Sequence, residues 1–108
     1  NKLYFGPDMV SDDEIALEWA RIPHFFYDYY VFQYATGFSA AVAIANRILA
    51  EGESAVADYK RFLSAGSSAD PISLLKIAGV DMSTAGPVDS ALALFGELID
   101  ELEKTLEE

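Results

Sequence analysis

Cysteine is absent from this 108-residue chain, and histidine occurs once, as His24. Without thiols the chain cannot form a disulfide framework, a thiolate metal site or a cysteine nucleophile, and thiol redox chemistry is excluded. Because cysteine-free chains are compatible with a reducing compartment, we expect a cytoplasmic protein. A zinc site needs three or four ligands from His, Cys, Asp or Glu, and the sequence has no HExxH pair. We therefore expect no metal bound by this chain alone.

Basic residues are scarce, since seven Lys and Arg stand against eighteen Asp and Glu, and the formal net charge is -11. This charge repels phosphate backbones and anionic lipid headgroups, so neither nucleic-acid binding nor membrane-surface binding is expected. The longest nearly uncharged stretch, residues 31–46, is shorter than the roughly 20 apolar residues of a spanning helix. The sequence therefore predicts no membrane span.

Several other catalytic patterns are missing. No nucleophile elbow accompanies His24, and the glycines separate helical segments without forming a phosphate-binding loop. Paired carboxylates occur at Asp12 and Asp13 and within residues 97–108, where a solvated helix face is the simpler interpretation. The length fits one compact domain or a piece of a larger protein.

Helical periodicity dominates what is present. Residues 1–10 are expected to form a loop that docks two aromatic rings. Ser11 and Glu14 form a capping-box pattern that predicts a helix beginning near Asp12, and Pro23 should end or kink it.

The middle of the chain predicts two helices. Residues 38–50 are apolar almost all round and should form a helix buried on most sides, with a bend at Gly37 before it. After Gly52, residues 53–65 should form a helix that Gly66 closes.

The last third predicts a short helix and a long one. Asp70 should cap residues 72–78, with Pro71 in the first turn and Gly79 as the stop, and Pro87 should open the final helix. That helix carries an apolar stripe of Val88, Ala91, Leu92, Phe95, Leu98, Ile99, Leu102 and Leu106. Its outer positions are Glu97, Glu101, Lys104 and Glu108. No β-period run occurs, so the fold class is all-α, with four or five packed helices.

An unusual aromatic block, residues 24–38, reads HFFYDYYVFQYATGF. If it is helical, His24, Tyr27, Tyr30 and Tyr34 follow one another at spacings of three, three and four and share one face. One interpretation is an aromatic core whose phenols reach its rim. The other is a set of neutral donors for a carbonyl oxygen that becomes negative during acyl transfer, each contributing about 3 kcal/mol in a dry cleft.

Two segments carry a resemblance to a known family. EWARIPHFFYDYYVFQYATGFSAAVAIANRIL (residues 18–49), together with DPISLLKIAGVDM and the terminal ALALFGELIDELEKTL, resembles the carboxy-terminal end of the oligoendopeptidase F family of thimet-oligopeptidase-like zinc metallopeptidases. The resemblance implies that residues 1–108 are a fragment of a larger helical catalytic domain. The zinc-binding HExxH part would lie upstream, and oligopeptides would be the substrate.

The same resemblance implies roles for four residues. His24 and Tyr34 match catalytic positions that steady the tetrahedral oxyanion, and Tyr27 and Tyr30 match or neighbour substrate-binding positions. Arg21 either pairs with a carboxylate or is an ordinary surface residue. The alternative is a freestanding helical module for protein interaction or self-association, in which an exposed apolar face is covered by another molecule. An HExxH motif encoded upstream would favour the enzyme.

Overall fold

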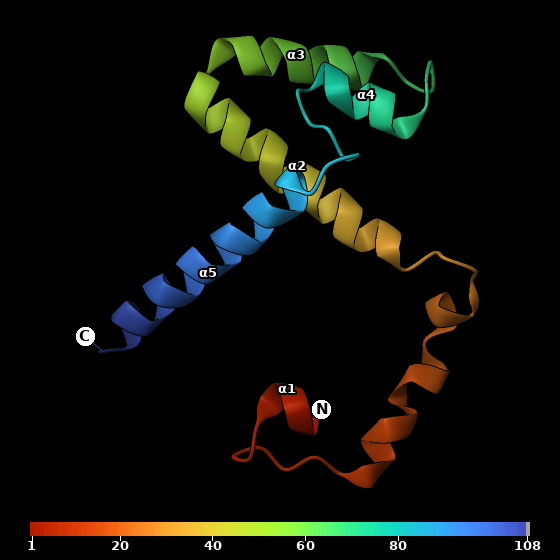
Figure 1. Ribbon diagram of the computed structural model, residues 1–108, viewed down its shortest axis with the longest axis vertical. Coiled ribbons are helices and arrows are strands. Elements are labelled where there is room, and N and C mark those ends of the chain that lie inside the picture. The colour runs from red at the N-terminus through yellow and green to blue at the C-terminus, as the bar shows by residue number, and fades with distance from the viewer. Residues whose placement is uncertain (108) are drawn as a thin grey trace. The chain divides into compact units, whose positions relative to one another are not determined.

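The computed structural model describes residues 1–107 and is helical, with no strand in that range (Figure 1). Glu108, placed above on the outside of the last helix, lies outside the described residues. The elements are α1 (Lys2–Phe5), η1 (Asp13–Arg21), η2 (Pro23–Phe26), α2 (Phe32–Glu51), α3 (Glu53–Ser64), α4 (Pro71–Ile77) and α5 (Gly86–Glu107). The prediction of an all-α fold is confirmed. The chain divides into two compact units, Asn1–Gln33 and Tyr34–Glu108.

The first unit contains short helices that differ from the predicted ones. Within the loop expected at residues 1–10, Lys2–Phe5 form the single turn α1, with the Phe5 N–H donating to the Asn1 carbonyl at 2.9 Å, and residues 6–10 are non-helical as expected. The predicted helix near Asp12 is the 3₁₀-helix η1. Its N-cap is Asp12, whose side chain makes no capping hydrogen bond, so the predicted capping box is wrong. As predicted, the helix ends before Pro23, which opens η2.

In the second unit α2 continues through Gly37 without interruption, so the bend predicted there is wrong. Its buried residues are Ser39, Ala40, Val42 and Ile44. The opposite side is open, and Leu49 is 85% exposed. The prediction that residues 38–50 are buried on most sides is therefore wrong. Within residues 34–107, the other helices of this unit cover only one face of α2.

The core of this unit is small. Ala40 and Ile44 from α2 pack with Ala78 and Val80, which follow α4. Partly buried side chains surround them: Ala43, Ile48, Tyr59, Phe62, Leu75 and Met82. α3 and α4 lie side by side (Figure 1). A local cap begins α4, since Asp70 Oδ1 accepts from the Ser73 N–H at 3.0 Å, as predicted for this N-cap.

Arg47 of α2 links three segments of the unit. Its Nη2 lies 2.8 Å from Asp58 Oδ2 of α3, its Nη1 donates to the Ala78 carbonyl at 2.8 Å, and its Nε lies 3.1 Å from Glu51 Oε2. Gly79 has φ +79°, and a Cβ there would lie 2.7 Å from Cζ of Arg47. The positive φ therefore favours glycine at this position, and a Cβ here would force the guanidinium of Arg47 to move.

The N-terminal end of α5 meets α2 (Figure 1). There Pro87 and Ala91 are buried, and Asn46 Nδ2 of α2 donates to Ser90 Oγ at 3.4 Å. Beyond that point its apolar stripe is exposed among the described residues. No helix within residues 1–107 has both the length and the apolar character needed to cross a membrane.

We expect Gly79→Ala to lower the free energy of unfolding more than Gly66→Ala does, as measured by urea denaturation. Gly66 has φ +55°, and no atom lies within 4 Å of the place that a Cβ would take, so alanine there costs about 1 kcal/mol of backbone strain alone. Alanine at 79 has the same strain and also displaces Arg47. In an Arg47→Ala background the two substitutions should cost the same, and a persistent difference would contradict the proposed steric conflict.

Acidification should destabilise the chain partly through Asp70. Hydrogen bonds from the Ser73 side chain and backbone N–H lower the pKa of Asp70 in the folded state. A lowered folded-state pKa gives stability that is present above the unfolded pKa of about 3.9 and is lost as the pH falls through the folded-state value. Asp70→Asn keeps a capping acceptor without titrating, so its unfolding free energy should change less below about pH 4 than that of the unmodified chain.

Asp70→Ala is the matched control for the cap itself. It should be less stable than Asp70→Asn at neutral pH, because it lacks an acceptor for the Ser73 N–H. If Asp70→Asn shows the same loss on acidification as the unmodified chain, Asp70 is not a source of the pH dependence.

Candidate functional site

Three of the four residues singled out from the sequence gather in one ring cluster, defined here as His24, Tyr27 and Tyr30. The His24 ring centroid lies 6.0 Å from that of Tyr27 and 5.6 Å from that of Tyr30. The two tyrosine rings meet edge to face at 5.9 Å and 87°. Each ring therefore contacts the other two, in geometries that aromatic pairs favour.

The backbone that builds the cluster is not the predicted helix. Only His24 lies in a helix, η2, while Tyr27 has an extended conformation and residues 27–31 are non-helical. Three successive turns connect them, because the N–H of Tyr27 donates to His24, that of Tyr30 to Tyr27 and that of Gln33 to Tyr30. The prediction of one helix face is therefore wrong for residues 24–30. Their rings still meet because these turns repeat every three residues.

Tyr34 is described in the second unit, in the first turn of α2, and is 57% exposed. The structure thus brings together His24, Tyr27 and Tyr30 within one unit and describes Tyr34 separately. Tyr27 is also more than half exposed, and His24 is half-buried. The ring cluster is therefore partly exposed at the surface of the first unit.

One residue of this region, Tyr29, was not singled out by the sequence analysis. Tyr29 has φ +52°, in the left-handed region that costs a side-chain-bearing residue about 1–2 kcal/mol. Its side chain is 90% exposed. The one sequence signal for a turn here is Asp28, since aspartate is common in turns and tyrosine is not.

Arg21 pairs with a carboxylate, which was one of the two interpretations of this residue from the sequence. Its Nη2 lies 2.5 Å from Glu18 Oε1, three residues earlier in η1. In a 3₁₀-helix side chains three apart eclipse one another, which explains the pairing. Both side chains are largely exposed, so the ion pair contributes little to stability.

The side chains of the described region do not fit a metal centre. Within residues 1–107 no group of three or more His, Asp or Glu side chains could hold a metal ion. The donors present in the ring cluster are an imidazole and two phenols, which suit hydrogen bonding to an oxygen.

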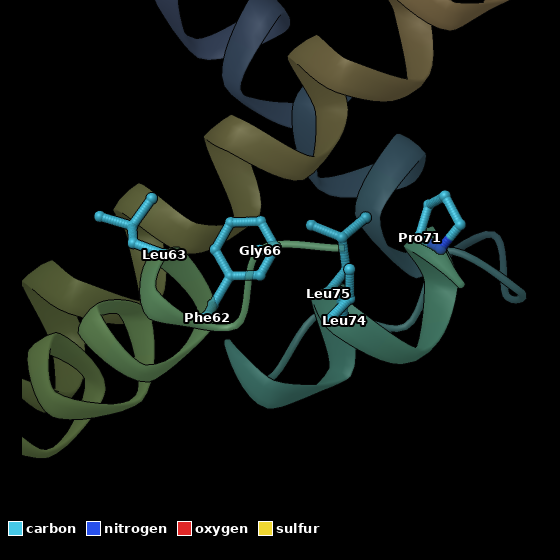
Figure 2. A pocket seen from close by; sticks show the side chains of 6 residues that line it. All are labelled: Phe62, Leu63, Gly66, Pro71, Leu74 and Leu75. Atoms are coloured by element: carbon cyan, nitrogen blue, oxygen red, sulfur yellow. The ribbon is translucent and has the colours of Figure 1, made fainter. Parts of the chain in front are cut away.

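A separate pocket of about 380 Å³ lies between α3 and α4 (Figure 2). Its lining is Phe62, Leu63, Gly66, Pro71, Leu74 and Leu75. None of these residues is titratable or nucleophilic, so the pocket can accept apolar groups but offers no catalytic group.

Comparison with known proteins gives consistent matches. Residues 1–94 match the model of Peptidase family M3. The chain is 58% identical over 106 residues to Oligopeptidase PepF from Bacillus subtilis, covering 98% of this chain and 16% of that protein. It is 45% identical over 107 residues to the chromosomal Oligoendopeptidase F of Lactococcus lactis subsp. cremoris, covering 99% of this chain and 18% of that protein.

A crystal structure of oligoendopeptidase-F from Enterococcus faecium superposes with a TM-score of 0.82 at 44% identity. The match covers 98% of this chain and 20% of that one. The chain thus spans less than a fifth of the length of these two curated relatives. The family match includes the whole aromatic block, the whole first unit and most of the second. On these grounds the chain belongs to Peptidase family M3.

Proposed function

We propose that this chain forms the carboxy-terminal part of the catalytic domain of a cytoplasmic, zinc-dependent oligoendopeptidase that hydrolyses internal bonds of short peptides. The observation that carries the proposal is the ring cluster at the surface of a chain that belongs to Peptidase family M3. The much greater length of the relatives supports the presence of further polypeptide, which would be the partner of this segment.

In this proposal His24 and Tyr34 are catalytic residues. The carbonyl oxygen of a peptide bond becomes negative when water adds to its carbon, and a donor that strengthens its hydrogen bond at that moment lowers the barrier. His24 can donate through a ring N–H and Tyr34 through its hydroxyl. Zinc held by another part of the polypeptide would supply the Lewis acid that activates water.

Tyr27 and Tyr30 are the proposed substrate-binding residues. Their rings meet edge to face and both contact His24, so two phenols and an imidazole lie together for contact with a peptide. Because residues 1–107 offer no metal-binding group, the 108-residue chain alone is expected to be inactive.

The test uses the complete gene product that contains this sequence. We expect it to bind zinc and to cleave oligopeptides, and we expect Tyr34→Phe to lower kcat about a hundredfold, because one oxyanion donor is lost. Zinc content should stay unchanged. The measurements are steady-state kinetics on a quenched fluorescent peptide and metal analysis of both proteins.

Tyr59→Phe is the matched control, since Tyr59 packs against Phe62 near the core of the second unit. It removes the same hydroxyl elsewhere and should leave kcat unchanged. A gene product without peptidase activity would overturn the proposed function, and an unchanged kcat in Tyr34→Phe would remove the role of Tyr34.

A second candidate function, self-association, is favoured by one observation on α5. Six apolar residues follow one another at alternating spacings of four and three, with exposed fractions from 40% to 77%: Val88, Leu92, Phe95, Ile99, Leu102 and Leu106. This is the repeat of a helix that packs lengthwise against another helix. A second copy of the chain could cover this face.

Self-association should be visible by sedimentation equilibrium of the 108-residue chain. Leu102→Lys places a charge in the apolar repeat and should shift the chain towards monomer. Glu101→Lys, one position along the helix and outside the repeat, introduces the same side chain and should not. A chain that is already monomeric without substitution would exclude this second function.

A further inference from the structure

The turn that holds the ring cluster depends on one unusual residue. Tyr29 is the one non-glycine residue within 1–107 that has a positive φ. It occupies the third position of the turn from Tyr27 to Tyr30, which the Tyr30 N–H closes by donating to the Tyr27 carbonyl at 3.2 Å. Turns with a positive φ at this position normally carry Gly or Asn.

The side chain of Tyr29 does not explain why a tyrosine is held there. It is 90% exposed, and among the described residues it has no ring contact or hydrogen bond. The contacts that accompany the turn belong to its neighbours instead. Tyr30 contacts the His24 ring at 5.6 Å and the Tyr27 ring at 5.9 Å.

The backbone at Tyr29 therefore decides where Tyr30 lies. Rotation of φ at Tyr29 from +52° into the negative range would swing Tyr30 away from its present place relative to Tyr27 and His24. The Tyr27–Tyr30 hydrogen bond and two of the three ring contacts depend on the left-handed conformation. Strained backbone conformations of this kind persist when the surrounding contacts hold them.

We infer that Tyr29 is a positioning residue, whose left-handed main chain, and not its phenol, holds Tyr30 against Tyr27 and His24 in the form that binds substrate. The inference rests on the proposed function, because the ring cluster is the proposed substrate-binding element. It assigns to position 29 a requirement for residues that tolerate a positive φ.

Three substitutions in the complete gene product test this requirement. Tyr29→Asn and Tyr29→Thr both remove the ring and leave a small polar side chain, but asparagine tolerates the left-handed region and β-branched threonine does not. Tyr29→Phe removes only the hydroxyl. The peptidase kinetics are measured together with the imidazole NMR signal of His24, identified as the one lost in His24→Gln.

Tyr29→Asn and Tyr29→Phe should keep KM within about twofold and leave the His24 signal in place, since the turn is retained. Tyr29→Thr should raise KM about tenfold and move the His24 signal, because the left-handed region becomes unfavourable and the neighbouring rings separate. The effect should fall on KM more than on kcat, whereas general loss of folded protein would lower the apparent kcat alone.

Other outcomes overturn the inference. Equal behaviour of Tyr29→Asn and Tyr29→Thr would show that the backbone conformation is not what matters, and an equal loss in all three variants would assign the role to the phenol. If Tyr29→Thr does not fold, Tyr29→Ser, which lacks the branching methyl group, replaces it, and its KM must then exceed that of Tyr29→Asn. A gene product without peptidase activity would remove the proposed function, while the His24 signal would still decide the role of Tyr29.

Discussion

Arg47 is the side chain on which the second unit depends, because it joins three segments that share little buried surface. Within residues 1–107 no large side chain is completely buried, and the core consists mainly of alanine, valine and isoleucine. A core of that kind provides modest hydrophobic stabilisation. Charge-assisted hydrogen bonds to Asp58 and to the Ala78 carbonyl fix the position of α3 and of the segment after α4 relative to α2. The hydrogen bond from Arg47 to Asp58 also lowers the pKa of the Asp58 carboxyl, with Arg61 as a second partner.

The first unit is organised differently, by short-range turns and ring contacts. Its helices η1 and η2 contain no buried residue. Turns that repeat every three residues bring an imidazole and two phenols together at the surface. The site thus depends on local backbone geometry, while the second unit depends on interactions between distant parts of the chain.

The accuracy of the sequence predictions follows the same division. α3, α4 and α5 were predictable to within a residue or so, because Asp70, Gly66 and the three-and-four apolar spacing act locally. Arg47 was not, since its partners lie 11 and 31 residues away along the chain. The meeting of His24, Tyr27 and Tyr30 was predicted correctly but for the wrong reason. Spacings of three fit both an α-helix and a series of turns, and tyrosine gives no warning of the left-handed backbone at position 29.

The lack of buried residues in η1 and η2 affects how the ring cluster responds to a ligand. Segments with few buried contacts open at low free energy, exchange their amide hydrogens readily and adjust most easily when a ligand binds. The aromatic residues that contact a peptide would then come from a weakly protected part of the described chain. Part of the interaction energy of a bound peptide would be used to order that part, so that affinity and local rigidity are linked.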